Sequence, residues 1–200
     1  MTDDLDLELG SEVALPQTQR LLADGGVRML NSFVSSPRCS PSRAAFLTGR
    51  HCHNLMPNLS REDDPKKLKV DGMTMFDPDA VFPTMRRAGY RTGIFGKIQN
   101  TQGGWLCMPQ NHSEPFDHIE TACKVCGDYY RPGATDWVTK QSHSDPHVMG
   151  PCCAGPEAAF SNYSEAQYGN RTIRWIKWMG VVEPDTPWFA YIGTTGPART

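Results

Sequence analysis

Cys39-Ser40-Pro41-Ser42-Arg43-Ala44-Ala45-Phe46-Leu47-Thr48-Gly49-Arg50 is a stretch with the signals of a short helix that begins at a cysteine. Pro41 has a φ angle suited to the first turn, and Gly49 is suited to end the helix. Cys39 or Ser40 is therefore expected at the cap, where backbone N–H groups and the positive end of the helix dipole favour an anion. Arg43 follows Cys39 by about one turn, so its guanidinium can reach back to an oxygen-bearing group there.

A cysteine at a helix start is most often a small buried residue. The whole pattern here, Cys-x-Pro-Ser-Arg followed by Leu-Thr-Gly-Arg, resembles the signature of the type I sulfatases. In that family the cysteine is oxidised after translation to formylglycine (3-oxoalanine), an aldehyde that hydrates to a geminal diol. The resemblance implies that Cys39 is the precursor of this group and that a formylglycine-generating enzyme is a partner of the chain.

A second pattern ends at a lysine. Residues 80–89 read as a short amphipathic helix closed by Gly89, and residues 90–95 read as a strand that leads to Gly96 and Lys97. This alternation is typical of a parallel sheet whose carboxyl edge carries a site. A lysine there is usually on the surface, but Gly-Tyr-x-Thr-x-x-x-Gly-Lys is similar to the second sulfatase signature, which implies that Lys97 binds a sulfate oxygen.

The same resemblance suggests further residues that could contact the substrate. Asn100 lies three residues after Lys97, as in glucosamine-6-sulfatase-like members, where many other members have Gly-Lys-Trp-His. His53 and Asn54 match a His-Asn pair of glucosamine-6-sulfatases, although histidines in a polar loop are more often simply exposed. The resemblance therefore makes Asn100, His53 and Asn54 candidate substrate contacts.

The amino end carries an acidic pair, Asp3 and Asp4. Acidic starts are usually solvated, frayed termini. Sulfatases, however, begin with a buried strand that ends in such a pair and binds calcium beside the formylglycine, and Ca²⁺ requires several oxygen ligands. The resemblance implies Asp3, Asp4 and position 39 as ligands of Ca²⁺. The preceding apolar strand is absent, so we expect the sequence to begin late, without that strand.

The remaining pattern predicts an α/β fold. Residues 14–24 and 164–179 read as helices, and residues 27–35 and 187–193 read as strands. We expect a mostly parallel central sheet flanked by helices, of the alkaline phosphatase/sulfatase type and incomplete. Residues 1–200 would be the N-terminal part of a sulfatase catalytic domain, lacking the first strand and the C-terminal half.

Composition narrows the setting. The 200 residues have a formal net charge of −2, which gives no long-range reason to expect nucleic acid or an anionic membrane as partner. No apolar run approaches the roughly 18 residues that span a bilayer. Seven cysteines and four Asn-x-Ser/Thr motifs indicate an oxidising compartment, so we expect a secretory, lysosomal or extracellular protein whose leader is absent here. The motifs begin at Asn58, Asn111, Asn162 and Asn170.

The cysteines other than Cys39 allow two interpretations. Disulfides are favoured, with Cys52 and Cys107 among the partners. The spacing of Cys123 and Cys126, with histidines and Cys152-Cys153 further on, also permits a zinc site, although adjacent cysteines are poor ligands for one ion.

The reaction implied by the resemblance is hydrolysis of a sulfate ester of a sugar or glycosaminoglycan, with aryl sulfates as surrogates. One diol hydroxyl at position 39 attacks sulfur, Arg43 holds the diol, and Lys97 neutralises charge on the sulfuryl oxygens. The second hydroxyl then loses its proton and the hemiacetal collapses, which a serine or cysteine could not achieve. Two alternatives stay open: a phosphate or phosphonate monoester hydrolase, and a truncated, non-catalytic homologue that binds sulfated glycans.

Overall fold

The computed structural model describes the chain in several ranges separated by gaps: residues 1–3, 5, 8, 10–55, 78–98, 116–122, 137–141 and 164–194. Its centre is a sheet with strand order β3-β2-β1-β4. The strands are β1 (Arg91–Gly96), β2 (His118–Ala122), β3 (Trp137–Gln141) and β4 (Trp188–Gly193). β1 pairs in parallel with both β2 and β4, whereas β3 is antiparallel to β2. The expected mostly parallel α/β sheet is confirmed.

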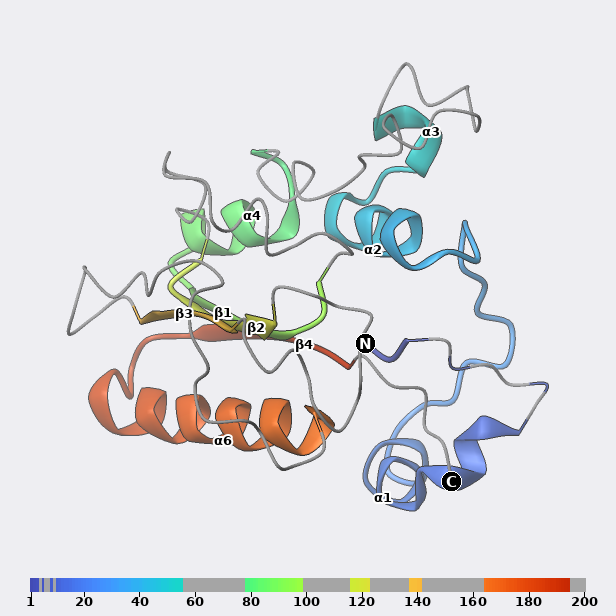
Figure 1. The fold of residues 1–200 in the computed structure, drawn as a ribbon, viewed down its shortest axis with the longest axis horizontal. Helices are drawn as coiled ribbons and strands as arrows, with labels where there is room; N and C mark the ends of the chain where they lie inside the picture. The colour runs from blue at the N-terminus through green and yellow to red at the C-terminus, as the bar shows by residue number, and fades with distance from the viewer. Residues whose placement is uncertain are drawn as a thin grey trace.

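Helices cover both faces of this sheet (Figure 1). α2 (Cys39–Thr48) and α4 (Val81–Arg87) lie on one face, and α6 (Ser164–Val182) runs along the other. The short helix α3 (Cys52–Leu55) follows α2. None of the helices in the described ranges is long and apolar enough to cross a membrane.

The strand β1 is buried on both faces, as central parallel strands are. Because successive side chains alternate, Ile94 joins one apolar cluster while Phe95 joins the other. The first cluster packs Phe82 of α4 and Leu47 of α2 against the sheet. The second packs Phe95 against Trp175 of α6, with ring centroids 5.7 Å apart. Both helical layers are thus tied to one strand, which fixes the end of β1 where the candidate site begins.

The helix α6 is longer than the predicted range of residues 164–179. It continues through Gly180 to Val182. Its buried residues Tyr168, Thr172, Trp175 and Met179 recur at helical spacing, whereas Ile173 is half exposed. The aromatic ring of Trp175 is large enough to decide the orientation of the helix.

The segment before α2 departs from the prediction. A helical region does occupy part of residues 14–24, as α1 (Pro16–Thr18) followed by a π-helical turn η2 (Gln19–Ala23), after a 3₁₀ turn η1 (Ser11–Ala14). Residues 27–35 do not form the predicted strand. Their apolar side chains are exposed, with Val27 at 83% and Phe33 at 89%. A strand requires a neighbouring strand for its backbone hydrogen bonds, and no described strand lies beside this segment.

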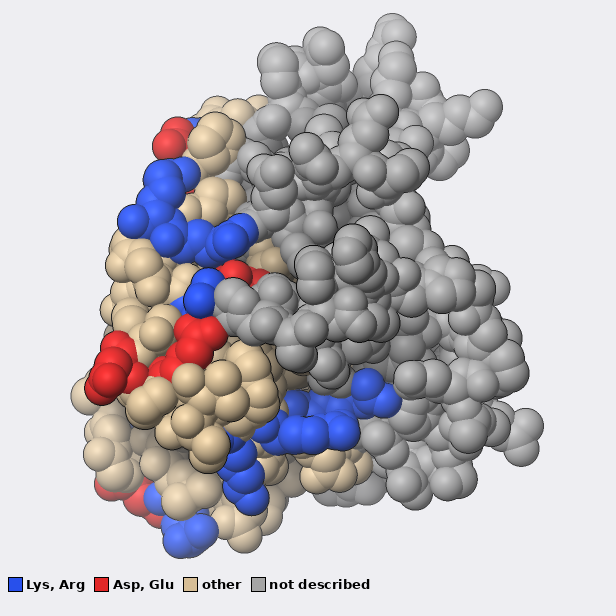
Figure 2. All heavy atoms as spheres, turned by 90° about the vertical axis from the view of Figure 1, so that its left-hand side faces the viewer, with Lys and Arg blue, Asp and Glu red and all other residues tan. Residues whose placement is uncertain are grey.

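The described surface mixes charges of both signs. Figure 2 shows the side of the molecule that is on the left in Figure 1. Lysine and arginine side chains lie there at the heights of α4 and α6, and aspartate and glutamate side chains lie between them. The ion pairs of the described residues include Arg91 with Glu183, at 2.7 Å. Another joins Arg50 to Asp79 at 3.2 Å. Part of the described positive charge is therefore neutralised by neighbouring acids.

Candidate active site

Cys39 is the first residue of α2, at the end of the helix where the dipole is positive. The cap itself is Arg38, which has extended backbone angles, so the prediction of Cys39 or Ser40 as cap is wrong by one residue. The amide of Ser42 donates to the carbonyl of Arg38 and closes the first turn. Gly49 ends the helix with a φ of 69°, as predicted. The Cys39 side chain is partly exposed, so position 39 combines access to solvent with a positive electrostatic environment.

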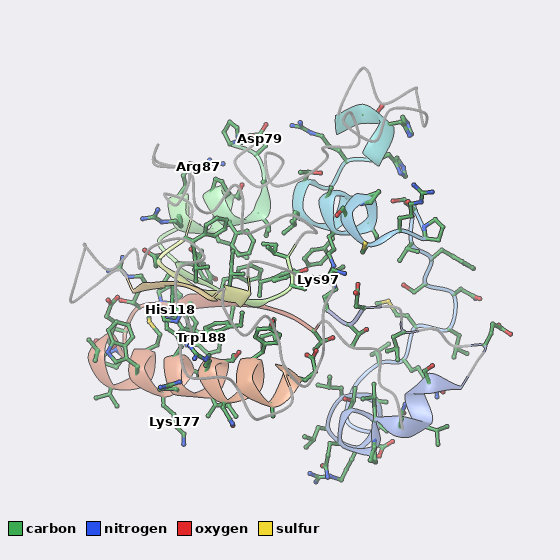
Figure 3. All side chains as sticks on the ribbon, in the orientation of Figure 1. Asp79, Arg87, Lys97, His118, Lys177 and Trp188 are labelled. Atoms are coloured by element: carbon green, nitrogen blue, oxygen red, sulfur yellow. The ribbon has the colours of Figure 1, made fainter. Side chains whose placement is uncertain are left out.

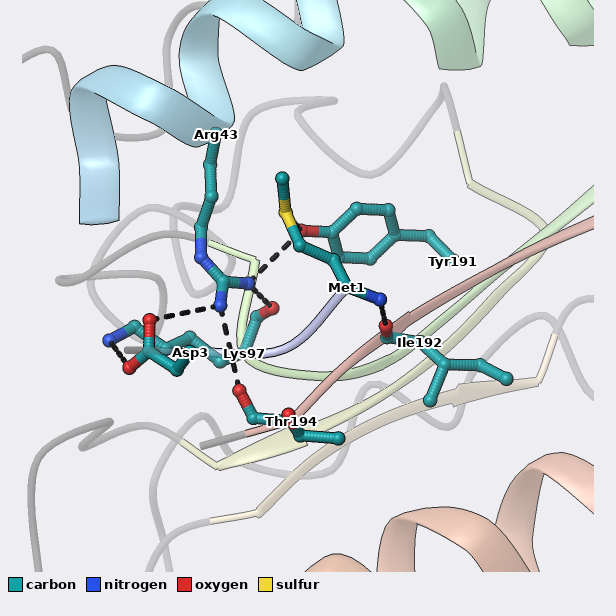
Figure 4. Close-up of polar contacts among 7 residues, drawn as sticks. All are labelled: Met1, Asp3, Arg43, Lys97, Tyr191, Ile192 and Thr194. Atoms are coloured by element: carbon teal, nitrogen blue, oxygen red, sulfur yellow. Dashed lines mark hydrogen bonds and ion pairs between the residues drawn. The ribbon is translucent and has the colours of Figure 1, made fainter. Parts of the chain in front are cut away.

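Arg43, one turn further along α2, points into the molecule and meets a lysine and an aspartate (Figure 4). Its Nη2 lies 3.2 Å from Oδ1 of Asp3, and the Nζ of Lys97 lies 2.6 Å from Oδ2 of the same carboxylate. The three residues are almost inaccessible, with 2% of Arg43, 2% of Lys97 and 8% of Asp3 exposed. One buried carboxylate therefore bridges two buried cations, an arrangement in which each charge depends on the others.

Lys97 reaches this cluster because β1 and β4 approach each other very closely at their ends. Gly96 has a φ of 77°, which disfavours any residue with a Cβ. A Cβ on Gly193 would collide with the Lys97 carbonyl and would lie 2.9 Å from Nη1 of Arg43. The amide of Lys97 donates to the Gly193 carbonyl at 2.7 Å. The two glycines thus turn the chain after β1 so that Lys97 faces the edge of the sheet next to α2 (Figure 3).

Asp3 is placed by the backbone of the first residues. The Met1 amino group donates to the Ile192 carbonyl at 2.8 Å, and the Thr194 amide donates to the Met1 carbonyl at 3.0 Å. These two bonds follow the pattern of a parallel pair with β4. Asp3 therefore lies at the carboxyl edge of the sheet, where functional residues of parallel α/β folds are found.

The prediction from sequence missed Tyr191 as part of this cluster. The Nη1 of Arg43 donates to the Tyr191 hydroxyl at 3.0 Å and also to the Lys97 carbonyl, and Nη2 donates to the Thr194 carbonyl at 3.5 Å. The Tyr191 hydroxyl donates in turn to Sδ of Met1 at 3.1 Å. Burial raises the pKa of Tyr191, and Arg43 opposes this effect only in part, so the hydroxyl stays neutral. A tyrosine at the end of an apolar strand gives a weak signal, because such residues usually serve packing alone.

Other predicted site residues lie elsewhere or outside the described ranges. His53 and Asn54 are exposed on α3, which lies on the side of α2 away from the sheet (Figure 1). The rings of His51 and His53 stack at 5.6 Å. The structure does not bring His53 and Asn54 to the cluster. Asp4 and Asn100 fall outside the described residues, so their predicted roles stay predictions.

Most of the cysteines in the predicted sites fall outside the described ranges. These are Cys107, Cys123, Cys126, Cys152 and Cys153, whereas Cys52 is the first residue of α3. Both interpretations therefore stay predictions.

The expected calcium site can be tested on Asp3. Both of its oxygens are bonded to cations, Oδ1 to Arg43 and Oδ2 to Lys97. Within the described ranges, no three His, Cys, Asp or Glu side chains are grouped as a metal site. Calcium needs about six to eight oxygen ligands. The described residues alone therefore do not fit a calcium ion.

Asp117 has a structural role in the sheet. Its Oδ2 accepts from the Thr92 amide at 2.9 Å and the Thr92 hydroxyl at 3.2 Å. Its Oδ1 lies 3.5 Å from Arg86 and 3.6 Å from Arg91. This carboxylate ties β1 to the start of β2, away from the Asp3 cluster.

The arrangement is suited to a small anion. The positive end of α2, the Arg43 guanidinium and the Lys97 ammonium lie in one region, and the described cluster carries one net positive charge. Such a group can stabilise negative charge that spreads over the oxygens of a tetrahedral centre.

Comparisons with known proteins show the family of the chain. A family model described as Sulfatase matches residues 2–198. The extracellular sulfatase SULF-1 homolog of Drosophila melanogaster is 37% identical over 109 residues, which are 54% of this chain and 10% of that protein. The putative extracellular sulfatase Sulf-1 homolog of Caenorhabditis elegans is 26% identical over 218 residues, covering 94% of this chain and 30% of that protein. Human N-acetylglucosamine-6-sulfatase is 33% identical over 107 residues, 52% of this chain and 19% of that protein.

Two solved structures show the fold over nearly the whole chain. One is a protein in complex with its substrate D-glucosamine-2-N,6-O-disulfate, with a TM-score of 0.62 and 21% identity, covering 98% of this chain and 33% of that one. The other, Ps i-CgsB, has a TM-score of 0.63 and 18% identity, covering 100% of this chain and 44% of that one. The expected sulfatase-like fold is confirmed, and this chain spans less than half the length of the relatives named here. Because the family model covers residues 2–198, the chain belongs to the sulfatase family.

Proposed function

We propose that this chain carries the sulfate-binding part of a sulfuric ester hydrolase that releases sulfate from a sulfated sugar. The observation that carries the proposal is the buried cluster of Arg43, Lys97 and Asp3 at the carboxyl edge of the sheet. Arg43 is on the helix that begins with Cys39. The family and the relatives named N-acetylglucosamine-6-sulfatase support a 6-sulfated glucosamine unit as substrate. The neighbour solved with a disulfated glucosamine supports the same sugar class.

Each residue has a proposed task. A formylglycine derived from Cys39 by a formylglycine-generating enzyme would supply a hydrated aldehyde, with one hydroxyl to accept the sulfuryl group and a second to release it. The start of α2 favours the anionic substrate at this position through its dipole. Lys97 stabilises charge on the sulfuryl oxygens, and Arg43 orients the group at position 39. Asn100, His53 and Asn54 are proposed substrate contacts for the sugar.

Asp3 and Asp4, together with position 39, are the proposed ligands of one Ca²⁺, with further ligands beyond the described residues.

We also propose that the protein follows the secretory route. Two relatives that are named extracellular sulfatases support this proposal.

Sulfate ester hydrolysis ranks above phosphate hydrolysis because the matching family model and the named relatives are sulfatases.

The test begins with the chain produced in a eukaryotic secretory host together with formylglycine-generating enzyme. Mass spectrometry of the Cys39 peptide should show conversion to the aldehyde. Turnover of an aryl sulfate should exceed that of the matching aryl phosphate, and 6-sulfated glucosamine should release sulfate. An unconverted thiol throughout, or faster turnover of the phosphate, would contradict the proposal.

Matched variants test the residues. Lys97→Ala should lower kcat by about 100-fold or more, because it removes a charge that stabilises the transition state. Lys177→Ala is the control, since Lys177 is exposed on α6 and points away from the sheet (Figure 3). Cys39→Ala should abolish turnover. Equal activity of the two lysine variants, or retained activity of Cys39→Ala, would show that the cluster does not carry the reaction.

A further inference from the structure

The guanidinium of Arg43 is held by four hydrogen bonds. Each of its two terminal nitrogens has two acceptors. Nη1 donates to the Lys97 carbonyl and the Tyr191 hydroxyl, and Nη2 donates to the Asp3 carboxylate and the Thr194 carbonyl. A guanidinium has four N–H bonds on these two nitrogens, so the four acceptors match them in number.

This count limits what Arg43 can offer to a substrate. The remaining donor is the N–H of Nε, the nitrogen nearest to α2 along the side chain. A contact between Arg43 and the group at position 39 therefore requires a guanidinium plane in which the N–H of Nε points toward position 39. Two of the four acceptors are backbone carbonyls at the ends of β1 and β4, and the Asp3 carboxylate is shared with Lys97.

Tyr191 is the hydroxyl among the four acceptors of Arg43, and it donates in turn to Sδ of Met1. It is 4% exposed, and its ring is fixed in the apolar cluster that includes Phe82, at a centroid distance of 6.0 Å. On the sheet it lies opposite Ile94 of β1. The packed ring therefore fixes the position of the Tyr191 hydroxyl relative to β4. The hydroxyl in turn holds the Nη1 side of the Arg43 guanidinium plane.

We propose that Tyr191 is a positioning residue of the active site, which holds the Arg43 guanidinium in the plane that directs Nε toward position 39. The assignment rests on the proposed function for its effect on turnover, but the effect on Arg43 itself does not depend on catalysis. Tyr191→Phe is the sharpest test, because it removes one oxygen and leaves the buried ring in place. Tyr168→Phe is the matched control, since Tyr168 is 2% exposed and has no bond to Arg43.

The first measurement is independent of activity. Phenylglyoxal modifies arginines whose guanidinium can rotate out of its contacts, and peptide mass spectrometry locates the adduct. The rate at Arg43 should rise by about threefold or more in Tyr191→Phe and should be unchanged in Tyr168→Phe, because a hydrogen bond to a charged group is lost only in the first. An unchanged rate at Arg43 in Tyr191→Phe would overturn the proposal.

The second measurement uses turnover of an aryl sulfate well below the melting temperature of each variant, on fully converted protein. Tyr191→Phe should lower kcat by about 10-fold and change KM by less than about twofold. In an Arg43→Lys background, which lacks the guanidinium plane, the same change should cost less than about twofold more. Equal losses in both backgrounds would show that Tyr191 acts on folding rather than through Arg43.

The phenylglyoxal and turnover measurements distinguish a failure of the proposed function from a failure of the positioning role of Tyr191. If the converted wild-type chain releases no sulfate while phenylglyoxal reactivity at Arg43 still rises in Tyr191→Phe, the proposed function is wrong and the contact to Arg43 stands. If the wild type releases sulfate and Tyr191→Phe matches it in both measurements, the positioning role is wrong and the proposed function stands.

Discussion

Removing the Asp3 carboxylate should be among the most damaging single changes in the described part of the chain. Asp3→Asn keeps the size of the side chain but leaves the Arg43 guanidinium and the Lys97 ammonium buried without their shared anion. Removing one partner of a buried ion pair costs about 3–5 kcal/mol, because the remaining charge stays desolvated. For a chain of 200 residues this corresponds to a fall in Tm of about 6–20 °C.

The assay is thermal unfolding followed by circular dichroism at low ionic strength. Asp79→Asn is the matched control, because its carboxylate also pairs with an arginine, Arg50, at 3.2 Å, but 73% of its side chain is exposed. An exposed pair contributes about 0–1 kcal/mol, so Asp79→Asn should lower Tm by no more than about 4 °C. If Asp3→Asn shifts Tm no further than Asp79→Asn, the cluster does not have the buried charge balance described above.

A double variant tests the pairing directly. Asp3→Asn combined with Lys97→Met removes the carboxylate together with one of its two cations. The combined loss should be smaller than the sum of the two single losses by about 1 kcal/mol or more, because the second change relieves an uncompensated charge. Additive losses would mean that the carboxylate and the ammonium do not interact, whatever their separation of 2.6 Å.

Packing, titration and modification each allow one further prediction. Phe82→Ala should destabilise the fold by about 3–5 kcal/mol in a urea titration, whereas Phe46→Ala, 56% exposed, should cost less than about half of that. Burial raises the pKa of Tyr168, so its contribution to stability is complete below about pH 10 and is lost as the pH rises further; Tm should therefore fall less between about pH 9.5 and 11.5 in Tyr168→Phe than in the wild type. Asn170 is exposed on α6, so protein from a secretory host should lose mass at this residue on treatment with peptide N-glycosidase.

The elements that the sequence predicted well are those whose partners are close along the chain or fixed by strong signals. The predicted strands at residues 90–95 and 187–193 agree within one residue with β1 and β4, because glycine or proline marks the ends of each. The helix after Cys39 was found because Pro41 and Gly49 mark its two ends. In each case the local signal and the tertiary environment favour the same structure.

Residues 27–35 show why the rest could not be predicted. Their apolar and β-branched content favours a strand, but strand formation depends on a neighbour that local sequence does not specify. The helix α6 shows a related effect. Ile173 and Trp175 are both apolar, but Trp175 packs against Phe95 of β1 while Ile173 is left half exposed.

The candidate site was predictable in its side chains and not in its backbone. Arg43, Lys97 and Asp3 stood out because motifs place charged groups at the ends of elements. Three of the other groups that fix Arg43 gave no comparable signal. They are the carbonyls of Lys97 and Thr194 and the missing Cβ of Gly193, and carbonyls are the same in every residue.

Anchoring Arg43 fixes more than the arginine. Cys39 precedes it by four residues on the same helix, a rise of about 6 Å, so the two positions move as one rigid turn. The guanidinium is bonded to the ends of both β1 and β4, which are parallel and paired along their whole length. The Arg43 side chain therefore connects the start of α2 to the carboxyl edge of the sheet. A nucleophile at position 39 gains a defined distance to Lys97 from this attachment, and any change that loosens Arg43 should displace that nucleophile as well as the charge that Arg43 carries.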